Sequence, residues 1–507
     1  MEASLSRRKE LITYLLAKNI LVDQELLALT NELDFNSIKE FLESYDGSES
    51  QLMYELRKLK QRFIPHPRPE SNLISSPVQE SEIPVAHLPR AAGNNVKILF
   101  SYTKKPKQIE LQDFVAYYVN RFTALKKILQ ARPELQSPLS INRLAGKRDR
   151  EPVAIIGMVK DKETTKSGGI SLILEDLTGS VKVFVNKNNK ELFGNAQDIV
   201  LDQVVGIVGA PGNNIVFANS IIEPDISFRE QKKAPIESYA LFLSDLHVGS
   251  RLFLRETFER FLAWINGGSG KQHEWVSKIK YIFVAGDIVD GCSIYPGQEK
   301  ELEIPDIYSQ YKECAALLSR IPKHITIIIS PGNHDAMRIS EPQPELYKDF
   351  AADLWKLENV VMVSNPGMVN IESAPGFPGF DVLIYHGYSF DYYIANVESI
   401  RNNGGYDRPD LIMRFMLKKR HLAPTHTSTL YIPDPESDPL VIDKVPDIFV
   451  TGHLHKVSAR AYKHVTLICG SCWQDKTPFQ EKLGHNPEPG RVPVLNLQTR
   501  ELRILRF

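Results

Sequence analysis

Five apolar runs in the C-terminal half of this sequence each end in polar residues and glycine, and this repeated pattern restricts the fold more than any other feature. The runs are YALFLSDLHVG, YIFVAGDIVDG, ITIIISPGNHD, DVLIYHGYSFD and DIFVTGHLHK. Apolar runs of this kind are typical of strands buried on both faces of a sheet. The strand, loop and helix order repeats, which predicts an α/β fold with its active site beyond the carboxyl ends of the strands.

These strand ends carry the side chains that could bind metal. The candidate ligands are Asp245, His247, Asp287, Asn333, His386, His453 and His455. Oxygen and nitrogen donors without a thiolate suit Mn, Fe or Zn. Any one histidine could be an ordinary core or surface residue, but five loops with ligands in the same position after a strand are poorly explained by coincidence.

The spacing of the candidate ligands suggests how they are arranged. Asp245 and His247 lie two residues apart, as do His453 and His455. In an extended segment both members of a pair point the same way, so each pair is expected to hold one metal. Glycines beside the ligands are expected to let the backbone turn tightly there; they are Gly249, Gly286, Gly332, Gly387 and Gly452.

The blocks DLH, GDIVDG, GNHD, HG and GHLH resemble the signature blocks of calcineurin-like metallophosphoesterases, over about residues 241–472. The resemblance implies a β-sandwich with flanking helices and two divalent metal ions, Mn first, with Fe, Zn and Mg as alternatives. It implies that Asp287 bridges the two ions and that His334 is catalytic, as the general acid, and not a ligand. The implied ligand sets are Asp245, His247, Asp287 and His455 for one ion, and Asp287, Asn333, His386 and His453 for the other.

Composition shifts divide the rest of the chain. We expect a small helical domain at 1–64, a disordered Pro-, Ser- and Glu-rich linker at 65–96, a helical lead-in at 97–150, an OB-fold barrel at 151–228 and the catalytic domain at 238–507. LEDLTGSVKVFV resembles the second and third strands of OB-folds. Such barrels often bind single strands, but this one could equally be architectural, and Phe184 could stack on a base or be buried.

A long helix is expected at about 108–130, with an aromatic stripe that includes Phe114, Tyr117, Tyr118 and Phe122. This stripe could stack on bases, but core packing is the more common explanation.

The domain order resembles that of the small subunits of archaeal family D DNA polymerases and the B-subunits of eukaryotic replicative polymerases. The segment 407–429 looks like one that the archaeal subunits carry. Because every ligand block is present, the resemblance favours the active archaeal type. It implies a 3′→5′ exonuclease that proofreads during DNA replication, with DNA carrying a 3′ end as substrate and a large polymerase subunit as partner, in a heterodimer or larger assembly. The basic run Lys418, Lys419 and Arg420 could contact DNA phosphates or form a solvated surface.

Two other functions remain open at this point. The chain could be a stand-alone phosphodiesterase for a small phosphate ester or cyclic nucleotide, although such an enzyme needs neither the barrel nor the helices. It could also be a non-catalytic scaffold that keeps a structural metal site.

Composition indicates the cellular compartment of the chain and the kind of surface that could bind DNA. The sequence has no apolar stretch long enough to span a membrane and no signal-peptide pattern at its start, and its four cysteines fit a reducing cytoplasm better than a disulfide framework. Cys469 and Cys472 form one CxxC, which without a second pair is weak evidence for a zinc site. Lys and Arg number 61 against 62 Asp and Glu, so DNA binding would need local basic patches.

Overall fold

The computed structural model describes residues 96–104, 107–147, 151–267, 273–482 and 484–507. The helical domain predicted at 1–64 and all but the last residue of the linker predicted at 65–96 lie outside the described residues. None of the described helices has the length and hydropathy that crossing a membrane requires.

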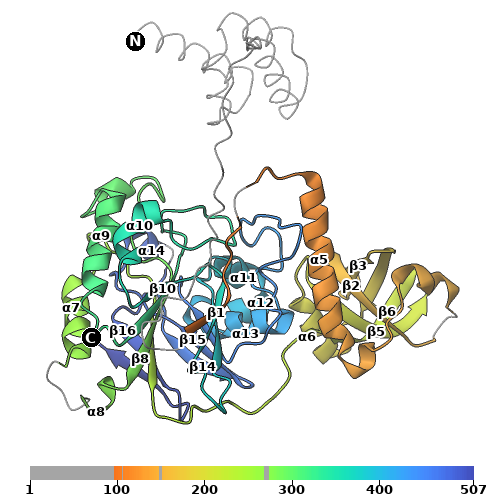
Figure 1. The fold of residues 1–507 in the computed structure, drawn as a ribbon. Coiled ribbons are helices and arrows are strands. Elements are labelled where there is room, and N and C mark those ends of the chain that lie inside the picture. Colours follow the sequence, from red (N-terminus) through yellow and green to blue (C-terminus); the bar gives the residue numbers. More distant parts are fainter. Residues whose placement is uncertain (1–95, 105–106, 148–150, 268–272, 483) are drawn as a thin grey trace, which may run out of the picture. The chain divides into compact units, whose positions relative to one another are not determined.

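Two six-stranded sheets form the catalytic half of the chain (Figure 1). The first sheet has the order β1 (Val96–Phe100), β11 (Gly367–Ile371), β12 (Phe380–Ile384), β13 (Ile448–Thr451), β15 (Val465–Cys469) and β14 (Ser458–Tyr462). The second has the order β10 (Val360–Met362), β9 (Thr326–Ser330), β8 (Ile279–Ala285), β7 (Tyr239–Leu243), β16 (Arg491–Asn496) and β17 (Leu502–Arg506). Strands β7, β8, β9 and β10 are parallel, as are β12, β13 and β15, so the carboxyl ends of the predicted strands share an edge in each sheet.

The sheets pack face to face, which confirms the predicted sandwich. Side chains such as Phe242, Phe283, Val382 and Val450 fill one core between the two inner faces. Two further cores lie on the outer faces, where the helices pack. This is why strands such as β7 and β12 are buried at every residue: one face meets the other sheet and the opposite face meets helices.

The helices divide between the two outer faces. The second sheet is covered by α7 (Arg255–Ile265), α9 (Ile307–Leu318) and α10 (Lys348–Trp355), seen along one side in Figure 1. The first is covered by α11 (Phe390–Asn396), α12 (Glu398–Arg401) and α13 (Pro409–Lys419). The short helix α8 (His273–Val276) lies between α7 and β8, and the short helix α14 (Pro478–Lys482) lies between β15 and β16.

A closed five-stranded barrel, as predicted, precedes every strand of this sandwich except β1 in the chain. Its strands are β2 (Val153–Thr164), β3 (Ile170–Asp176), β4 (Gly179–Val185), β5 (Val204–Gly212) and β6 (Ile215–Ile222), in the closed order β2-β3-β4-β6-β5, with α6 (Lys190–Gln197) between β4 and β5. This is the strand order of an OB-fold. Asp176 shapes the predicted turn after β3, because its carboxylate accepts hydrogen bonds from the backbone N–H groups of Thr178 and Gly179.

Residues 97–100 depart from the predicted helical lead-in, and Val96 departs from the predicted linker. They form β1, which pairs antiparallel with β11 in the catalytic sheet. The run VKILF contains two β-branched residues, and the edge of β11 offers it backbone hydrogen-bond partners. The chain therefore begins its described part in the catalytic domain, runs through the barrel and returns.

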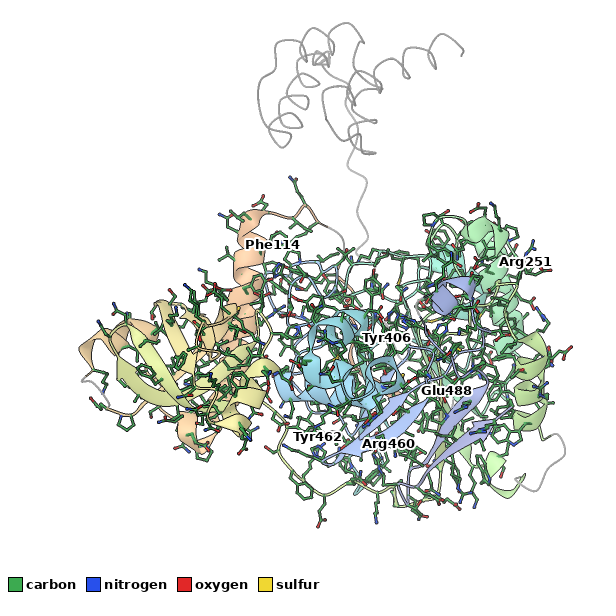
Figure 2. The ribbon with its side chains drawn as sticks, turned by 180° about the vertical axis from the view of Figure 1, so that it is seen from behind. Phe114, Arg251, Tyr406, Arg460, Tyr462 and Glu488 are labelled. Carbon is green, nitrogen blue, oxygen red and sulfur yellow. The ribbon has the colours of Figure 1, made fainter. Side chains whose placement is uncertain are left out.

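The predicted long helix is α5 (Leu111–Gln130), and its aromatic stripe is used for packing. Tyr117 and Phe122 are buried, and the Tyr117 ring stacks on Tyr431 of the catalytic half with centroids 5.1 Å apart. Phe114, near the start of the helix (Figure 2), is 37% exposed.

A buried ion pair fixes the same helix to the catalytic half. Arg121 Nε donates to Asp438 Oδ2 at 2.6 Å, and both side chains are almost fully enclosed. Tyr462 on β14, in the catalytic half (Figure 2), donates to Asp225, in the segment that leaves β6.

Candidate metal centre

The site assembles where both sheets present the carboxyl ends of parallel strands. Asp245 and His247 follow β7, and Asp287 follows β8. The other candidate ligands follow β9, β12 and β13: Asn333, His386, His453 and His455. The structure therefore brings all seven sequence-derived ligand candidates to one place, within or next to a single pocket.

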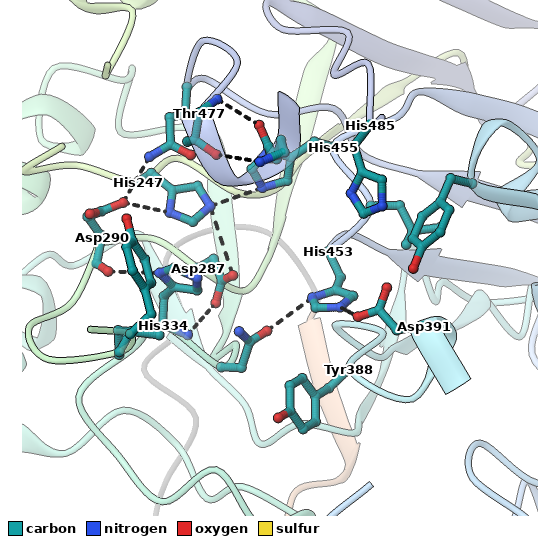
Figure 3. Close-up of a pocket in the computed structure, with 17 residues that line it drawn as sticks. His247, Asp287, Asp290, His334, Tyr388, Asp391, His453, His455, Thr477 and His485 are labelled. Atoms are coloured by element: carbon teal, nitrogen blue, oxygen red, sulfur yellow. Dashed lines mark hydrogen bonds and ion pairs between the residues drawn. The ribbon is translucent and has the colours of Figure 1, made fainter. Parts of the chain in front are cut away.

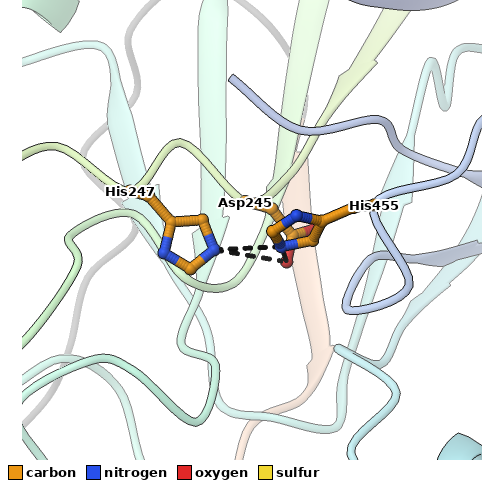
Figure 4. Close-up of side chains that lie close together, drawn as sticks. All are labelled: Asp245, His247 and His455. Carbon is orange, nitrogen blue, oxygen red and sulfur yellow. Dashed lines mark hydrogen bonds and ion pairs between the residues drawn. The ribbon is translucent and has the colours of Figure 1, made fainter. Parts of the chain in front are cut away.

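One group of donors gathers around Asp245 (Figure 4). His455 Nε2 lies 3.4 Å from Asp245 Oδ1 and 3.1 Å from His247 Nε2. His247 Nε2 lies 4.0 Å from Asp245 Oδ1. Three side-chain donors from two different sheets thus converge on one point.

A second group is joined to the first through Asp287. Its Oδ2 atom lies 3.9 Å from His247 Nε2 and 3.2 Å from His386 Nε2. Asn333 Oδ1 lies 3.0 Å from His386 Nε2 and 3.1 Å from His453 Nδ1. A single carboxylate oxygen therefore faces both groups, which is the arrangement that a bridging ligand requires.

The donor set fits a pair of divalent cations. Ligand atoms about 2.0–2.2 Å from a shared ion lie within about 4.4 Å of one another, and every separation given above is 4.0 Å or less. The two Nε2 atoms of His247 and His455, 3.1 Å apart, repel unless a proton or a cation lies between them. Carboxylates, imidazoles and one amide, with no thiolate among them, are the ligands expected for Mn, Fe or Zn.

The electrostatics of the site also favour cations. Burial alone would raise the pKa of Asp287, but the surrounding imidazoles, His386 foremost, hold it well below its usual value. Burial lowers the pKa of His386, yet the carboxylate of Asp287 outweighs this and raises it to about 10. In the same way, the pKa of Asp245 is lowered against its burial, with His455 as the main cause. The carboxylates therefore stay ionised and draw positive charge into the site.

An outer set of residues, which the sequence analysis did not single out, orients the ligands. Asp290 Oδ1 lies 3.1 Å from His247 Nδ1 and accepts from Gln474 Nε2 at 2.9 Å, while its Oδ2 accepts from Gln298 Nε2 at 3.1 Å. Asp391 Oδ2 lies 2.8 Å from His453 Nε2. Such carboxylates fix the tautomer and direction of a metal-binding imidazole. Asp290 could have been found, since it is the second aspartate of GDIVDG.

His334 lies in the pocket but is held differently from the ligands (Figure 3). Its Nδ1 lies 2.8 Å from the backbone oxygen of Asp290, so Nδ1 carries a proton and donates it, and its ring packs edge-on against His247. Its backbone N–H donates to Asp287 Oδ1 at 2.8 Å. Burial lowers the pKa of His334, and the nearby Asp287 carboxylate partly opposes this. One ring nitrogen, Nε2, is left for chemistry.

The backbone of the ligand loops is not extended, which corrects one expectation. Asp245, His247, Asp287, His453 and His455 all have positive φ, between 51° and 69°. This left-handed region is uncommon for residues other than glycine. The expectation that each pair holds one metal is wrong for the second pair, because His455 joins Asp245 and His453 joins Asp287.

Glycines make room for the ligands as well as turning the chain. A Cβ on Gly332 would lie 2.2 Å from Asp287 Oδ1, and one on Gly452 would lie 2.6 Å from Asp245 Oδ2. Neither glycine has positive φ. At these two positions it is therefore the missing side chain, and not backbone freedom, that the site uses.

The pocket over these groups has a volume of about 290 Å³, at the small end of the range for ligand sites. Aromatic side chains line it beyond the ligands, with Tyr388 and Asp391 beside His453 (Figure 3). The other aromatic lining residues are Tyr295, Tyr406 and His485.

Most of the basic run proposed for DNA contact is buried and bonded within the protein. Lys419 is 2% exposed and pairs with Glu223. Arg420, 6% exposed, donates to the backbone oxygens of Ile442 and Asp443. These two side chains have no surface on which to meet a phosphate. Lys418 is about one-third exposed and lies 3.5 Å from the same Glu223.

The two cysteines of the CxxC do not form a separate metal site. Cys469 ends β15 and Cys472 follows it, both are buried and neither is in a disulfide. No group of potential metal ligands found among the described residues includes either of them.

Two sheets packed face to face with this set of Asp, His and Asn donors at their edge define a metallophosphoesterase, and the calcineurin-like phosphoesterase family matches residues 239–457. The DNA polymerase II small subunit of Methanothermobacter thermautotrophicus is 41% identical over 389 residues, which cover 76% of this chain and 78% of that protein. The small subunit of Pyrococcus furiosus is 39% identical over 410 residues, 80% of this chain and 65% of that longer protein. The chain belongs to the family of archaeal DNA polymerase II small subunits.

Proposed function

We propose that this chain is a 3′→5′ exonuclease that hydrolyses DNA phosphodiester bonds and proofreads for a DNA polymerase. The observation that carries the hydrolytic part is the shared carboxylate: Asp287 Oδ2 faces both donor groups. The direction of digestion and the DNA substrate rest on the family to which the chain belongs.

The residues divide the work as follows. Asp245, His247, Asp287 and His455 would hold one divalent ion, and Asp287, Asn333, His386 and His453 the other. When bound, a pair of divalent ions lowers the pKa of a water and stabilises charge on the phosphate oxygens. We favour manganese, with iron, zinc or magnesium as alternatives, because the donor set mixes imidazole with oxygen.

His334 supplies the proton that the leaving oxygen needs. The bond to Asp290 fixes its ring, so Nε2 is held towards the pocket. A phosphate that enters beside it brings negative charge, which favours the protonated imidazole. Asp290 thus serves two roles, since its carboxylate orients His247 and its backbone oxygen orients His334.

The partner is proposed from the same family. Relatives named small subunits imply a large polymerising subunit, so we propose a heterodimer or a larger assembly. This chain should then not extend a primer when it is free of any large subunit, and extension by the pure chain would contradict an accessory role.

The decisive experiment adds Mn²⁺ to the purified chain with single-stranded DNA. With a 5′ label, exonuclease action from the 3′ end gives a ladder of shortening products; with a 3′ label, it gives mononucleotide at once. Asp287→Asn should abolish both, whereas Asp353→Asn, which changes a carboxylate on α10 that pairs with Lys356, should not.

The same assay separates the alternatives. Hydrolysis of a nitrophenyl phosphodiester without any action on DNA would favour a small-ester phosphodiesterase. Hydrolysis of neither, by a chain that binds metal, would favour a scaffold. Activity that survives Asp287→Asn would come from a contaminant and would remove the support for the proposal.

A further inference from the structure

The outer face of the barrel carries two phenylalanine rings that its core does not use. Phe184 on β4 and Phe217 on β6 are paired in register on neighbouring parallel strands. Their inward neighbours Val183 and Val216 fill the barrel core. Phe217 is 48% exposed, and the two rings meet edge to face with centroids 6.1 Å apart.

Small residues leave the surface around the two rings open. A Cβ on Gly169 would lie 2.7 Å from the Phe184 ring, and one on Gly212 would lie 2.9 Å from the Phe217 ring, so each ring rests against glycine. The next residues across the sheet are Ser171 and Ala210. Packing against glycine can stabilise a barrel, but it does not require the exposure that Phe217 retains.

The charge on this face is positive near the rings. Lys182 lies two residues before Phe184 on β4 and is exposed; across the sheet it is paired with Ile173 on one side and Ile215 on the other. Lys187 lies over Gly168 in the loop between β2 and β3. Within the described residues neither lysine has an ion-pair partner, whereas Lys160 pairs with Glu175 at 3.2 Å.

Carboxylates bound the patch on one side. Asp161 and Glu163 lie on β2, and by register they are two strands away from Lys182 and Phe184. The favourable path for an anion therefore runs over β4 and β6, along the rings.

We propose that this surface, defined by Phe184, Phe217, Lys182 and Lys187 and called here the barrel face, binds single-stranded DNA. Exposed rings can stack on bases only where the bases are unpaired, and stacking tolerates any sequence. Lysines beside them match the spaced phosphates of the backbone. The site is independent of the metal centre and of the hydrolysis proposed above.

The test measures binding of a fluorescent oligothymidylate to the full-length chain by anisotropy in EDTA, where metal-dependent hydrolysis cannot occur. Phe217→Ala should weaken binding roughly 5- to 150-fold, the range for one lost stacking partner. Lys182→Glu should weaken binding and reduce its dependence on salt, by about 0.7 in the log–log slope for each lost phosphate contact.

Matched controls change the same residue types elsewhere. Phe228→Ala removes a ring that is 78% exposed after the barrel, and Lys323→Glu reverses a lysine that is 84% exposed in the catalytic half. Both should bind as the unaltered chain does. Thermal unfolding should be similar for all four variants, because no change removes a fully buried side chain.

Three results would overturn the proposal: equal losses in Phe217→Ala and Phe228→Ala, unaltered binding by both barrel-face variants, or equally tight binding of blunt duplex. A failure of the exonuclease assay would leave this measurement unaffected, since it needs neither metal nor catalysis.

Discussion

Asp290→Asn tests how the metal ligand His247 is oriented. The carboxylate accepts from three donors: His247 Nδ1 and Gln474 Nε2 at one oxygen, and Gln298 Nε2 at the other. An asparagine has only one oxygen, so its NH₂ group must face a donor whichever way the amide turns. If it faces His247, that ring takes the tautomer whose Nε2 is protonated and cannot bind metal. If it faces Gln298, a buried donor loses its acceptor.

The expected losses in metal affinity and in stability follow from these three hydrogen bonds. An outer carboxylate of this kind typically contributes 10–100-fold in metal affinity, or about 1.4–2.7 kcal/mol. A buried donor left unsatisfied costs about 1–3 kcal/mol of stability. In either orientation Asp290→Asn should lower the free energy of unfolding, because a buried donor loses its acceptor. Where the NH₂ group faces His247, the substitution should also weaken the Mn²⁺ site of that histidine by that factor, while the site around His386 and His453 keeps its ligands.

Calorimetric titration of the chelator-treated chain with Mn²⁺ would show the two sites separately. Asp391→Asn is the matched control, since Asp391 orients His453 but its side chain is 50% exposed and water can replace the lost partner. Its effect should be the smaller one. Unaltered affinity at both sites together with an unaltered free energy of unfolding would refute the argument that this carboxylate holds His247 and the two glutamine donors.

Three more outcomes are expected. Asp287→Ala should lower bound metal well below two ions per chain in elemental analysis, because one carboxylate serves both sites, and two retained ions would contradict the ligand assignment. His334→Ala should lose roughly 10²–10⁴-fold in rate while it binds near-normal Mn²⁺ and DNA, with a smaller defect on a nitrophenyl ester; an equal defect on that ester would show a binding role. Burial, aided by Arg121, lowers the pKa of His421 to about 4, so the chain should lose up to about 3 kcal/mol as pH falls from about 6.5 to about 4; in urea unfolding at several pH values, His421→Gln should flatten that loss, and an unchanged pH dependence would contradict it.

The sequence was informative where short-range pattern and fold agree. Buried strands such as β7 read as continuous apolar runs because both of their faces are covered. The ligands follow these strands at once, so their convergence could be expected from parallel strand order alone. The barrel was recognisable for a similar reason, since its strands are short and separated by turns such as the one at Thr178.

The features that could not be predicted from the sequence depend on contacts between residues far apart in the chain. Strand β1 pairs with β11 some 270 residues later, and nothing in VKILF itself marks that partner. Gln474 reaches Asp290 across 184 residues. Lys419 and Arg420 looked like a surface because charge usually stays in water, but Glu223 and backbone oxygens enclose them.

The positive φ angles of the ligand residues have a consequence for the engineering of this protein. Each left-handed residue other than glycine costs the folded chain roughly 1–2 kcal/mol, and five of them lie in the ligand loops. Replacing one by glycine would relieve that backbone cost, but it would also remove a ligand and leave the buried partners of the lost side chain unpaired. At these positions backbone geometry and metal binding are therefore linked, and a screen for more stable variants must also select for metal binding.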